Sequence, residues 1–455
     1  MKYLVFILFL ISCVKEEFID ATSYYVSPTG SDTNTGTITA PWRTWYYGIN
    51  KLVAGDILYI RGGTYISVQG SGGGNLSGVY ITNKSGTSTN HIKVSMYPGD
   101  ARPILDCGVL TSVAGYHRGI FMNNCNYWDF YGLIVQNIRE YSGSPTTYSG
   151  SAWEVSGGSN IRIEYCTVTN AMNGFSMTGT IYNLNYINCD SYSNYDIYQS
   201  GDLCNGFNGH MEAASTITYT GCRAWQNSDD GFDFMAGAGY INLTNCWTWD
   251  NGPWHGGDAS GNGDGFKIVR DHSTSTFNGI GSQRTLKNCI SVSNHNIGIE
   301  AYAYDGGSGT RPMDMVFYNC IIANNTAYGL RQDYTAGWGD RVVKNCVSYG
   351  NGYTQYEGYS GYVVDHNSWD LAVLANSADF ISVDYNQLAT VRKTDGSLPD
   401  VTAFHLVAGS DLIDKGINVA LPFNGSAPDL GVFEYGTIPS TLGKLIKSKG
   451  KLIVK

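Results

Sequence analysis

A right-handed parallel β-helix, with an N-terminal cap and an irregular C-terminal extension, is the fold that this sequence predicts. The first supporting feature is a unit that recurs from residue 160 onward, in which a strand ends in an (Asn/Gly)-Cys step and an asparagine follows five residues after the cysteine. The second is composition, because 57 Gly, 34 Tyr and only 15% charged residues indicate many turns and short strands. The third is length: 455 residues exceed what one ordinary core supports, whereas each unit of a solenoid packs only on its neighbours.

The N-terminus has the features of an export signal ahead of the fold. Residues 3–11 form an apolar run that is too short to span a bilayer, and it leads into a lipobox-like Cys13. We therefore expect residues 1–12 to be a lipoprotein signal peptide, Cys13 to carry the lipid, and residues 13–21 to form a lipid-anchored linker. The segment Val14-Lys15-Glu16-Glu17 resembles the short acidic signal that sends bacterial lipoproteins to the outer face of the outer membrane, and this resemblance implies a cell-surface location. The alternative interpretation of the apolar run is a buried core strand.

The repeat itself predicts two buried columns of side chains. Cysteine spacings from Cys166 to Cys346 run 23, 33, 24, 43, 31 and 26 residues, so each unit is about one coil and the longer coils carry inserted loops. Equivalent residues of adjacent coils lie roughly 4.8 Å apart. The cysteines should therefore stack as reduced, inward-facing thiols, and the asparagines should hydrogen-bond to their copies at the turns. One cysteine per coil lacks the paired spacing of zinc sites. The complete units are Asn188-Cys189 with Asn194, Gly221-Cys222 with Asn227, Asn245-Cys246 with Asn251, Asn288-Cys289 with Asn294, Asn319-Cys320 with Asn325, and Asn345-Cys346 with Asn351.

The segments on either side of the repeat complete a single β-helix domain over residues 22–436. Residues 22–66 are expected to form the N-terminal cap and first strands, and residues 355–435 to form the last coils, a C-terminal cap and the irregular extension. Residues 437–455 form a basic tail. The formal charge of -10 argues against a nucleic-acid partner, so an anionic ligand would need a local basic patch or a bound cation. We expect a monomer that contacts a membrane only through its lipid.

An acidic turn is the first candidate for chemistry. Asp229, Asp230 and Asp233 lie within five residues, at a glycine-containing turn that leads into a strand. Calcium takes six to eight hard oxygen ligands, and such a cluster can supply several of them. The alternative is a solvated acidic turn without a metal.

A lysine in the next coil is the second candidate. Lys267 stands between Phe266 and Ile268 in a short strand, so alternation points its side chain away from the core, toward solvent. The alternative is an ordinary surface lysine.

Taken together, four segments resemble the family 9 polysaccharide lyases, which are pectate-lyase-like and rhamnogalacturonan-lyase-like β-helices. The resemblance covers most of residues 22–436 and implies Lys267 as the catalytic base and Asp229, Asp230 and Asp233 as calcium ligands. The segments that carry it are Gly221-Cys-Arg-Ala-Trp225, Asn227-Ser-Asp-Asp-Gly-Phe-Asp233, Gly261-Asn-Gly-Asp-Gly-Phe-Lys267 and Ala427-Pro-Asp-Leu-Gly-Val-Phe-Glu-Tyr435.

The chain departs from the family pattern at one candidate ligand. The family has an aspartate in an upstream Asp-Gly-Phe step, and Asn205 occupies that place here. An amide oxygen can coordinate calcium without adding charge, so Asn205 is expected to be a weaker ligand. Asp202, three residues earlier, is the candidate to compensate.

The resemblance implies β-elimination on an acidic plant cell-wall polysaccharide that contains galacturonate. Removing the proton next to a uronate carboxylate requires that carboxylate to be neutralised, by calcium or by cationic side chains. Arg223 and Arg270 are candidates for such a clamp, although a structural or surface role is the alternative for both.

The substrate stays open between homogalacturonan and the rhamnogalacturonan I backbone. The missing charge at Asn205 favours the second, and so do three tryptophans that could stack on less charged sugars, Trp247, Trp249 and Trp254. Two other functions stay open as well: a β-helix glycoside hydrolase of the polygalacturonase type, and a non-catalytic glycan-binding solenoid.

Overall fold

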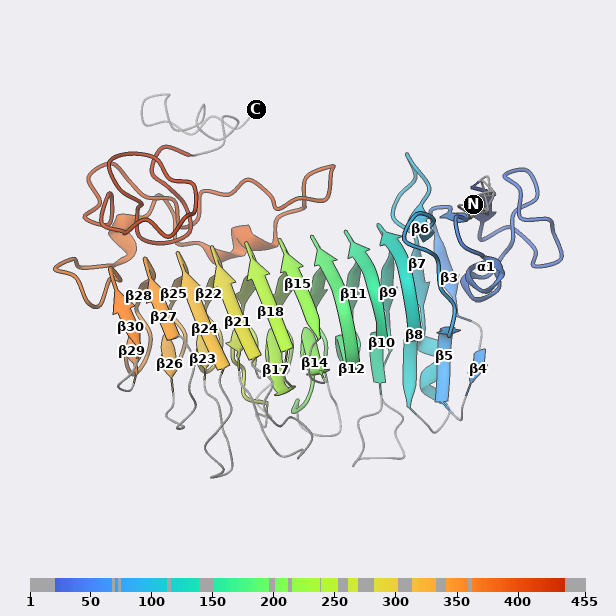
Figure 1. The fold of residues 1–455 in the computed structure, drawn as a ribbon, viewed down its shortest axis with the longest axis horizontal. Helices are drawn as coiled ribbons and strands as arrows, with labels where there is room; N and C mark the ends of the chain where they lie inside the picture. The colour runs from blue at the N-terminus through green and yellow to red at the C-terminus, as the bar shows by residue number, and fades with distance from the viewer. Residues whose placement is uncertain are drawn as a thin grey trace, which may run out of the picture.

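The structure is a computed structural model, and it confirms the parallel β-helix (Figure 1). It describes residues 21–67, 70–72, 75–112, 116–138, 150–195, 201–211, 215–237, 239–252, 261–268, 282–301, 313–332, 341–358 and 362–437. The expected signal peptide, Cys13, Trp254, Arg270 and the tail from residue 438 lie outside the described residues. No helix among the described residues is long and apolar enough to cross a membrane.

Two parallel sheets wind around the core. In most coils two strands join the larger sheet and one joins the smaller, and each strand pairs in parallel with its equivalents one coil before and after; β4 and β5 pair antiparallel. The larger sheet contains β1 (Ser23–Val26), β2 (Ile57–Ile60), β4 (Gly70–Gly72), β5 (Asn75–Thr82), β6 (Ile92–Met96), β8 (His117–Tyr131), β10 (Gly150–Glu164), β12 (Asn173–Ile187), β14 (Phe207–Met211), β15 (Thr216–Thr220), β17 (Phe232–Gly237), β18 (Gly239–Thr244), β20 (Phe266–Lys267), β21 (Ser282–Lys287), β23 (Ile299–Ala301), β24 (Met313–Tyr318), β26 (Leu330–Gln332), β27 (Arg341–Lys344), β29 (Tyr356–Glu357) and β30 (Val363–Asp365). The smaller sheet contains β3 (Thr64–Ile66), β7 (Ile104–Asp106), β9 (Ile134–Gln136), β11 (Thr167–Thr169), β13 (Asp190–Tyr192), β16 (Arg223–Trp225), β19 (Trp247–Trp249), β22 (Ile290–Val292), β25 (Ile321–Ala323) and β28 (Val347–Tyr349).

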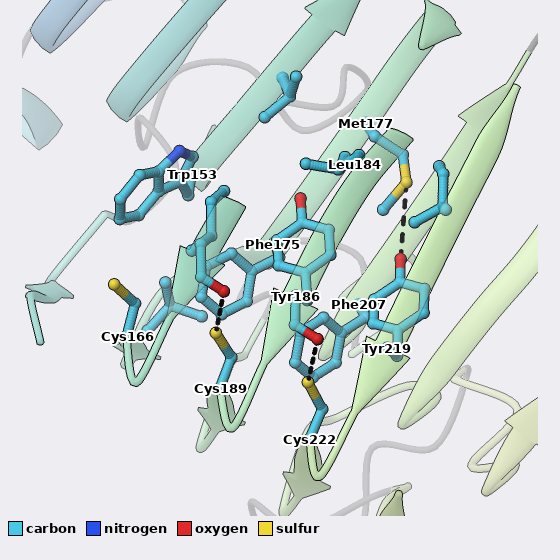
Figure 2. Packing of buried hydrophobic residues seen from close by; sticks show 14 of the residues in the cluster. Trp153, Cys166, Phe175, Met177, Leu184, Tyr186, Cys189, Phe207, Tyr219 and Cys222 are labelled. Atoms are coloured by element: carbon cyan, nitrogen blue, oxygen red, sulfur yellow. Dashed lines mark hydrogen bonds between the residues drawn. The ribbon is translucent and has the colours of Figure 1, made fainter. Parts of the chain in front are cut away.

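The core is built from identical positions stacked coil on coil (Figure 2). Phe207 stacks on Phe175 with ring centroids 5.1 Å apart and on Phe232 at 4.7 Å. The predicted thiol column is confirmed, because all ten cysteines of the described residues are buried and free. Cys189 and Cys222 each donate to a backbone carbonyl of the preceding coil, at 3.2 and 3.4 Å. Burial of the thiols inside the solenoid, not disulfide pairing, therefore accounts for one cysteine per coil.

The predicted asparagine column is also confirmed. Asn194, Asn227, Asn251, Asn294, Asn325 and Asn351 are buried, and the Nδ2 of each of the first five donates to the Oδ1 of the next, at 2.8 to 3.0 Å. A different asparagine adopts the left-handed backbone, since Asn188 and Asn245, directly before the cysteines, have φ of 54° and 55°. The two turn functions, hydrogen bonding between coils and left-handed geometry, thus fall on separate residues of each unit.

Both ends of the solenoid are covered. The helix α1 (Trp45–Lys51) buries Trp45 and Ile49 against the first coils, and Trp369 stacks on Tyr356 of the last coil at 5.2 Å. Short 3-10 helices η1 (Gly108–Ser112), η2 (Ser377–Asp379) and η3 (Tyr385–Ala389) complete the described elements.

The C-terminal extension also covers part of the smaller sheet. From residue 366 it folds back along the outside of the smaller sheet, above β22, β25 and β28 in Figure 1. Trp247 and Trp249 lie beneath it, each 2% exposed, together with Phe404 and Leu412. The expectation that these two tryptophans stack on sugars is therefore wrong, because the extension covers them.

Candidate active site

The candidate site lies on the outer face of the larger sheet, along one row of side chains. In this row Asp233 of β17 pairs with Lys267 of β20, and Lys267 pairs with Glu300 of β23. Phe232 and Phe266 are their neighbours on the inner side, so the predicted alternation at Lys267 is confirmed. We call the set the active-face row; its members, one per coil, are Tyr80, Phe121, Glu154, Ser176, Asn208, Asp233, Lys267, Glu300, Arg331 and Glu357.

The turns that precede these strands form a ladder of their own. An (Asn/Asp)-Gly-Phe step recurs in four successive coils, and its first residue accepts a hydrogen bond from the backbone of the coil that follows. These bonds run from Asn205 N to Asn173 Oδ1 (3.0 Å), Asp230 N to Asn205 Oδ1 (2.9 Å), Asp264 N to Asp230 Oδ1 (2.7 Å) and Ile297 N to Asp264 Oδ1 (3.0 Å). The second residue of the step is glycine because a side chain would not fit there: a Cβ at Gly231 would lie 2.1 Å from Thr248 Oγ1.

The second terminal atom of each ladder residue is left for other contacts. Asp230 Oδ2 accepts a hydrogen bond from Lys267 Nζ at 3.1 Å. Asn205 Nδ2 donates to Asp233 Oδ2 at 3.3 Å. Asp264 Oδ2 is buried, and no hydrogen-bond donor reaches it within the described part of the chain.

Asp229 joins three turns rather than facing the lysine. Its Oδ1 accepts from Asn262 N at 2.6 Å, and its Oδ2 accepts from Leu203 N at 3.0 Å. Both oxygens therefore accept hydrogen bonds from backbone N–H groups of the flanking coils, and these bonds hold the turns of Asn205 and Asp264 in place.

The electrostatics of the site are dominated by negative charge. Burial raises the pKa of Asp230 to about 6, with Lys267 opposing the rise and Asp233 adding to it. Burial, then Asp230, also raises the pKa of Asp229 and of Asp264. Burial would lower the pKa of Lys267, but attraction to Asp230, Asp233, Asp229 and Asp264 outweighs it and raises that pKa above its usual range. The negative charge of four carboxylates thus acts on one ammonium that is largely removed from water.

Lys267 is more enclosed than its alternation suggested. It is only 5% exposed, and Asp230 is fully buried. The expectation of a solvent-facing amine is therefore wrong, because the ammonium turns toward the carboxylates beside it instead of extending into water.

These carboxylates have the chemistry of a binding site for a hard cation, but their side chains are not yet arranged around one point. Within the described ranges, no three His, Cys, Asp or Glu side chains are arranged to hold a metal ion. Even so, a buried excess of carboxylate oxygens, one of them without a donor, suits a divalent cation such as calcium. The residues that would hold it are Asp230, Asp233 and Asp264, with Asp229 behind them.

Asn205 does not present the oxygen expected of a ligand. Its Oδ1 is occupied by the backbone N–H of Asp230, and that donor fixes the amide orientation. The group that faces the site is Nδ2, which can only donate. The prediction of Asn205 as a metal ligand therefore lacks support in this geometry, and a role in positioning Asp233 fits it better.

Arg223 lies on the other sheet and serves the fold. It is 3% exposed on β16, donates to both carboxylate oxygens of Asp190 at 2.8 and 2.9 Å, and donates to the carbonyls of Leu388 and Thr390 in the extension. The suggested substrate clamp at Arg223 is thus corrected to a structural anchor. Arg270 lies outside the described residues.

Two residues of the site were missed by the sequence reasoning. Asp264 sits inside the motif that contains Lys267, and Glu300 follows Lys267 in the row. The signal that could have found Asp264 was the recurrence of (Asn/Asp)-Gly-Phe in consecutive coils, which places it in line with Asp230.

Known proteins resemble this chain in sequence and in fold. Pectate lyase L of Dickeya chrysanthemi is 29% identical over 417 residues, covering 90% of each chain. The crystal structure of pectate lyase Pel9A superposes with a TM-score of 0.70 at 26% identity, covering 91% of this chain and 97% of that one. A rhamnogalacturonan lyase structure has the same fold, with a TM-score of 0.72 at 24% identity over 85% of this chain and 97% of its own.

A family model described as the Pel9A-like, right-handed β-helix region matches residues 24–311, which confirms both the handedness of the solenoid and the resemblance inferred from its motifs. This chain belongs to the Pel9A-like right-handed β-helix family.

Proposed function

We propose that this chain cleaves a galacturonate-containing pectic polysaccharide by calcium-assisted β-elimination, with Lys267 as the base. The similarity to pectate lyase L and to pectate lyase Pel9A supports a polysaccharide lyase that acts on pectic substrates. The single observation that carries the mechanism is the pairing of Lys267 with Asp233 and its hydrogen bond to Asp230, which place one amine among buried carboxylates on the outer face.

Calcium and Lys267 have separate roles in the proposed reaction. When bound, calcium would neutralise the uronate carboxylate, so that the proton on the adjacent carbon becomes acidic. Lys267 then accepts that proton through Nζ. The electron pair of the broken C–H bond forms the carbon–carbon double bond of the product, the glycosidic C–O bond breaks, and the leaving oxygen takes up a proton. The carboxylates that raise the pKa of Lys267 are also those that would hold the cation, so neutralising them weakens the attraction that keeps the amine protonated. Burial of Lys267 and Asp230 excludes water, which strengthens each of these interactions.

The charges of the active-face row favour a polymer with spaced carboxylates. Beyond Lys267 the row continues with Glu300 and Arg331, one and two coils further on. Adjacent coils lie about 4.8 Å apart, so a polysaccharide that runs along the row would place its sugar units over successive coils. Glu300 would repel a uronate next to the cleaved one, whereas Arg331 would attract a uronate two units away. We therefore favour the rhamnogalacturonan I backbone, in which galacturonate alternates with a neutral sugar, over homogalacturonan.

A cavity lies on the other side of the cleavage position. It measures about 260 Å³ and is lined by polar residues of the row and its neighbours, including Glu154, Ser176, Asn208 and His210. Hydroxyl and amide groups of this kind bind sugar hydroxyls. The polymer would thus lie along the row, across several coils.

The two rival functions explain less. A glycoside hydrolase needs one carboxylic acid and one carboxylate on either side of the bond, and it leaves Lys267 without a role. A non-catalytic binding solenoid, in which Asp229, Asp230 and Asp233 hold a purely structural ion, accounts for the carboxylates but gives the buried amine no role.

The deciding experiment measures product. Only elimination creates an unsaturated, ultraviolet-absorbing sugar, so we expect absorbance to rise on rhamnogalacturonan, more slowly on homogalacturonan, and not at all in excess chelator. Calcium should restore the rate, and Asp230→Ala should behave like the chelated enzyme. Reducing ends without absorbance would establish the hydrolase, and full activity in chelator would remove calcium from the mechanism.

We also propose that the chain is exported as a lipoprotein through Cys13 and acts as a monomer at the outer membrane. Cys13→Ser should release the protein from washed membranes, whereas membrane retention would contradict the lipid anchor.

A further inference from the structure

We propose that Asp264 supplies the cation-binding carboxylate that Asn205 does not, so that the calcium ligands of this chain are centred on Asp230, Asp233 and Asp264. This inference rests on the calcium-assisted function proposed above. It moves one ligand position from the coil before Asp230 to the coil after it.

The turn ladder makes Asn205 and Asp264 equivalent. Both precede a Gly-Phe step, both lie one coil from Asp230, and both use Oδ1 to accept a backbone N–H of the coil that follows. They differ in the second atom, which is an amide nitrogen in Asn205 and a carboxylate oxygen in Asp264. A cation beside Asp230 would therefore meet a donor on one side and an acceptor on the other.

The carboxylate of Asp264 is held rigidly with one oxygen unused. Its Oδ1 accepts from Asn296 Nδ2 at 2.8 Å and from Ile297 N at 3.0 Å, which fixes the plane of the group. The residue is fully buried, and in the described part of the chain no donor reaches its Oδ2. A buried carboxylate oxygen without a donor is costly in a folded protein and calls for an ion or another partner.

Asp264 also acts within the same cluster as the lysine and the other aspartates. Asp264 N donates to Asp230 Oδ1 at 2.7 Å and Lys267 Nζ donates to Asp230 Oδ2 at 3.1 Å, so the three residues meet at Asp230. Asn205 cannot take this place by rotating its amide, because the N–H of Asp230 would then lose its acceptor. The charge that the family pattern places before Asp230 is thus found after it.

The test is direct calcium binding to the full-length protein without substrate, by titration calorimetry. Asp264→Asn keeps the Oδ1 acceptor for Asn296 and Ile297 and removes only the charge, so the fold should persist. We expect calcium to bind at least about tenfold more weakly, because ligand charge sets affinity in oxygen sites. Asp202→Asn is the matched control: it removes the same charge three residues from Asn205, where compensation was expected from sequence, and it should bind calcium like the native protein.

Melting temperatures in chelator and in calcium provide a second measurement. Native protein and Asp202→Asn should gain the same calcium-induced stabilisation, and Asp264→Asn should gain much less while melting normally in chelator. The inference is overturned if Asp264→Asn binds calcium like the native chain, or if Asp202→Asn is the weakened variant. Failure of the proposed function looks different, because then the native chain binds no calcium or forms no unsaturated product.

Discussion

Two buried clusters, one on each sheet, pair aspartate with cationic side chains, and they differ in charge balance. On the smaller sheet Asp190 receives hydrogen bonds from both Arg223 and Arg392, so two guanidinium groups face one carboxylate. On the larger sheet Lys267 donates to Asp230 and pairs with Asp233 of the adjacent strand, and Asp229 and Asp264 add further negative charge. The first cluster has surplus positive charge and the second has surplus negative charge.

The pKa values follow this balance. Burial alone would raise the pKa of Asp190, but Arg392 and Arg223 outweigh it and hold that pKa well below its usual range. Burial raises the pKa of Asp230 to about 6 even though a lysine touches it. The cluster whose carboxylate is fully paired holds the extension on the solenoid, whereas the cluster with surplus carboxylates is suited to a cation and a proton transfer. A buried charge therefore points to a functional site only where the opposite charges around it do not balance it.

The largest effect should come from removing the base. We expect Lys267→Ala to lose at least about 10⁴-fold in turnover, the upper end for general base catalysis, because the variant removes the amine that accepts the proton. The structure also predicts a loss of stability in chelator, since the variant leaves buried carboxylates without their ammonium. Initial rates and melting curves measure the two effects.

Lys267→Arg separates catalysis from stability. It keeps the positive charge, so its melting temperature should stay close to native, but guanidinium remains protonated and cannot accept the proton. If either variant retains more than about a tenth of native activity, far above what loss of a base allows, another residue is the base.

The compensated cluster should respond in stability. Arg392→Ala leaves Asp190 with only Arg223 and removes the bonds to the carbonyls of Cys189 and Gly221, so we expect the free energy of unfolding to fall by about 3–5 kcal/mol. Urea denaturation measures this loss. Activity per folded molecule should persist, because the cluster lies on the other sheet; a variant that folds normally but loses turnover would break the distinction between the clusters.

Lowering the pH should change the stability that the two clusters contribute in opposite directions. Asp230 has a folded pKa of about 6 against 3.8 for the free side chain, so between these values the folded chain binds more protons than the unfolded one. The free energy of unfolding must therefore fall as pH rises through this window, by up to about 3 kcal/mol for Asp230 alone. Asp190, with a lowered pKa, loses its contribution only in strong acid.

The measurement is urea unfolding in chelator at pH 5 and pH 7.5. Asp230→Asn should reduce the difference, and calcium should offset it by binding the ionised carboxylates. Greater stability at pH 7.5 than at pH 5 in chelator would show that the carboxylates are not strained by their burial.

The local repeat was sufficient to predict the solenoid, the thiol and asparagine columns, and the neighbouring coils of Asp233 and Lys267, because each depends only on period and alternation. The burial of Trp247 and the anchoring role of Arg223 could not be predicted, since both depend on a segment more than a hundred residues away that follows no repeat. Alternation gives the side on which Lys267 lies but not its burial. Asp264 was within reach, but only by aligning coils with each other.

A third set of charges lies between the two extremes and should give the smallest effect. Arg331 is 33% exposed in its side chain and approaches Glu300 at 3.9 Å and Glu357 at 3.4 Å, which are longer contacts than those of the buried clusters. Partly exposed ion pairs of this kind contribute about 0.2–1 kcal/mol.

If Arg331 attracts a second uronate, Arg331→Ala should raise KM on rhamnogalacturonan up to about fivefold, the equivalent of about 1 kcal/mol, with kcat unchanged. Arg162→Ala is the matched control, because Arg162 pairs with Glu164 at 2.6 Å away from the active-face row and should leave KM unchanged. An equal change in both variants would mean that general surface charge, and not this position, draws the polymer to the enzyme.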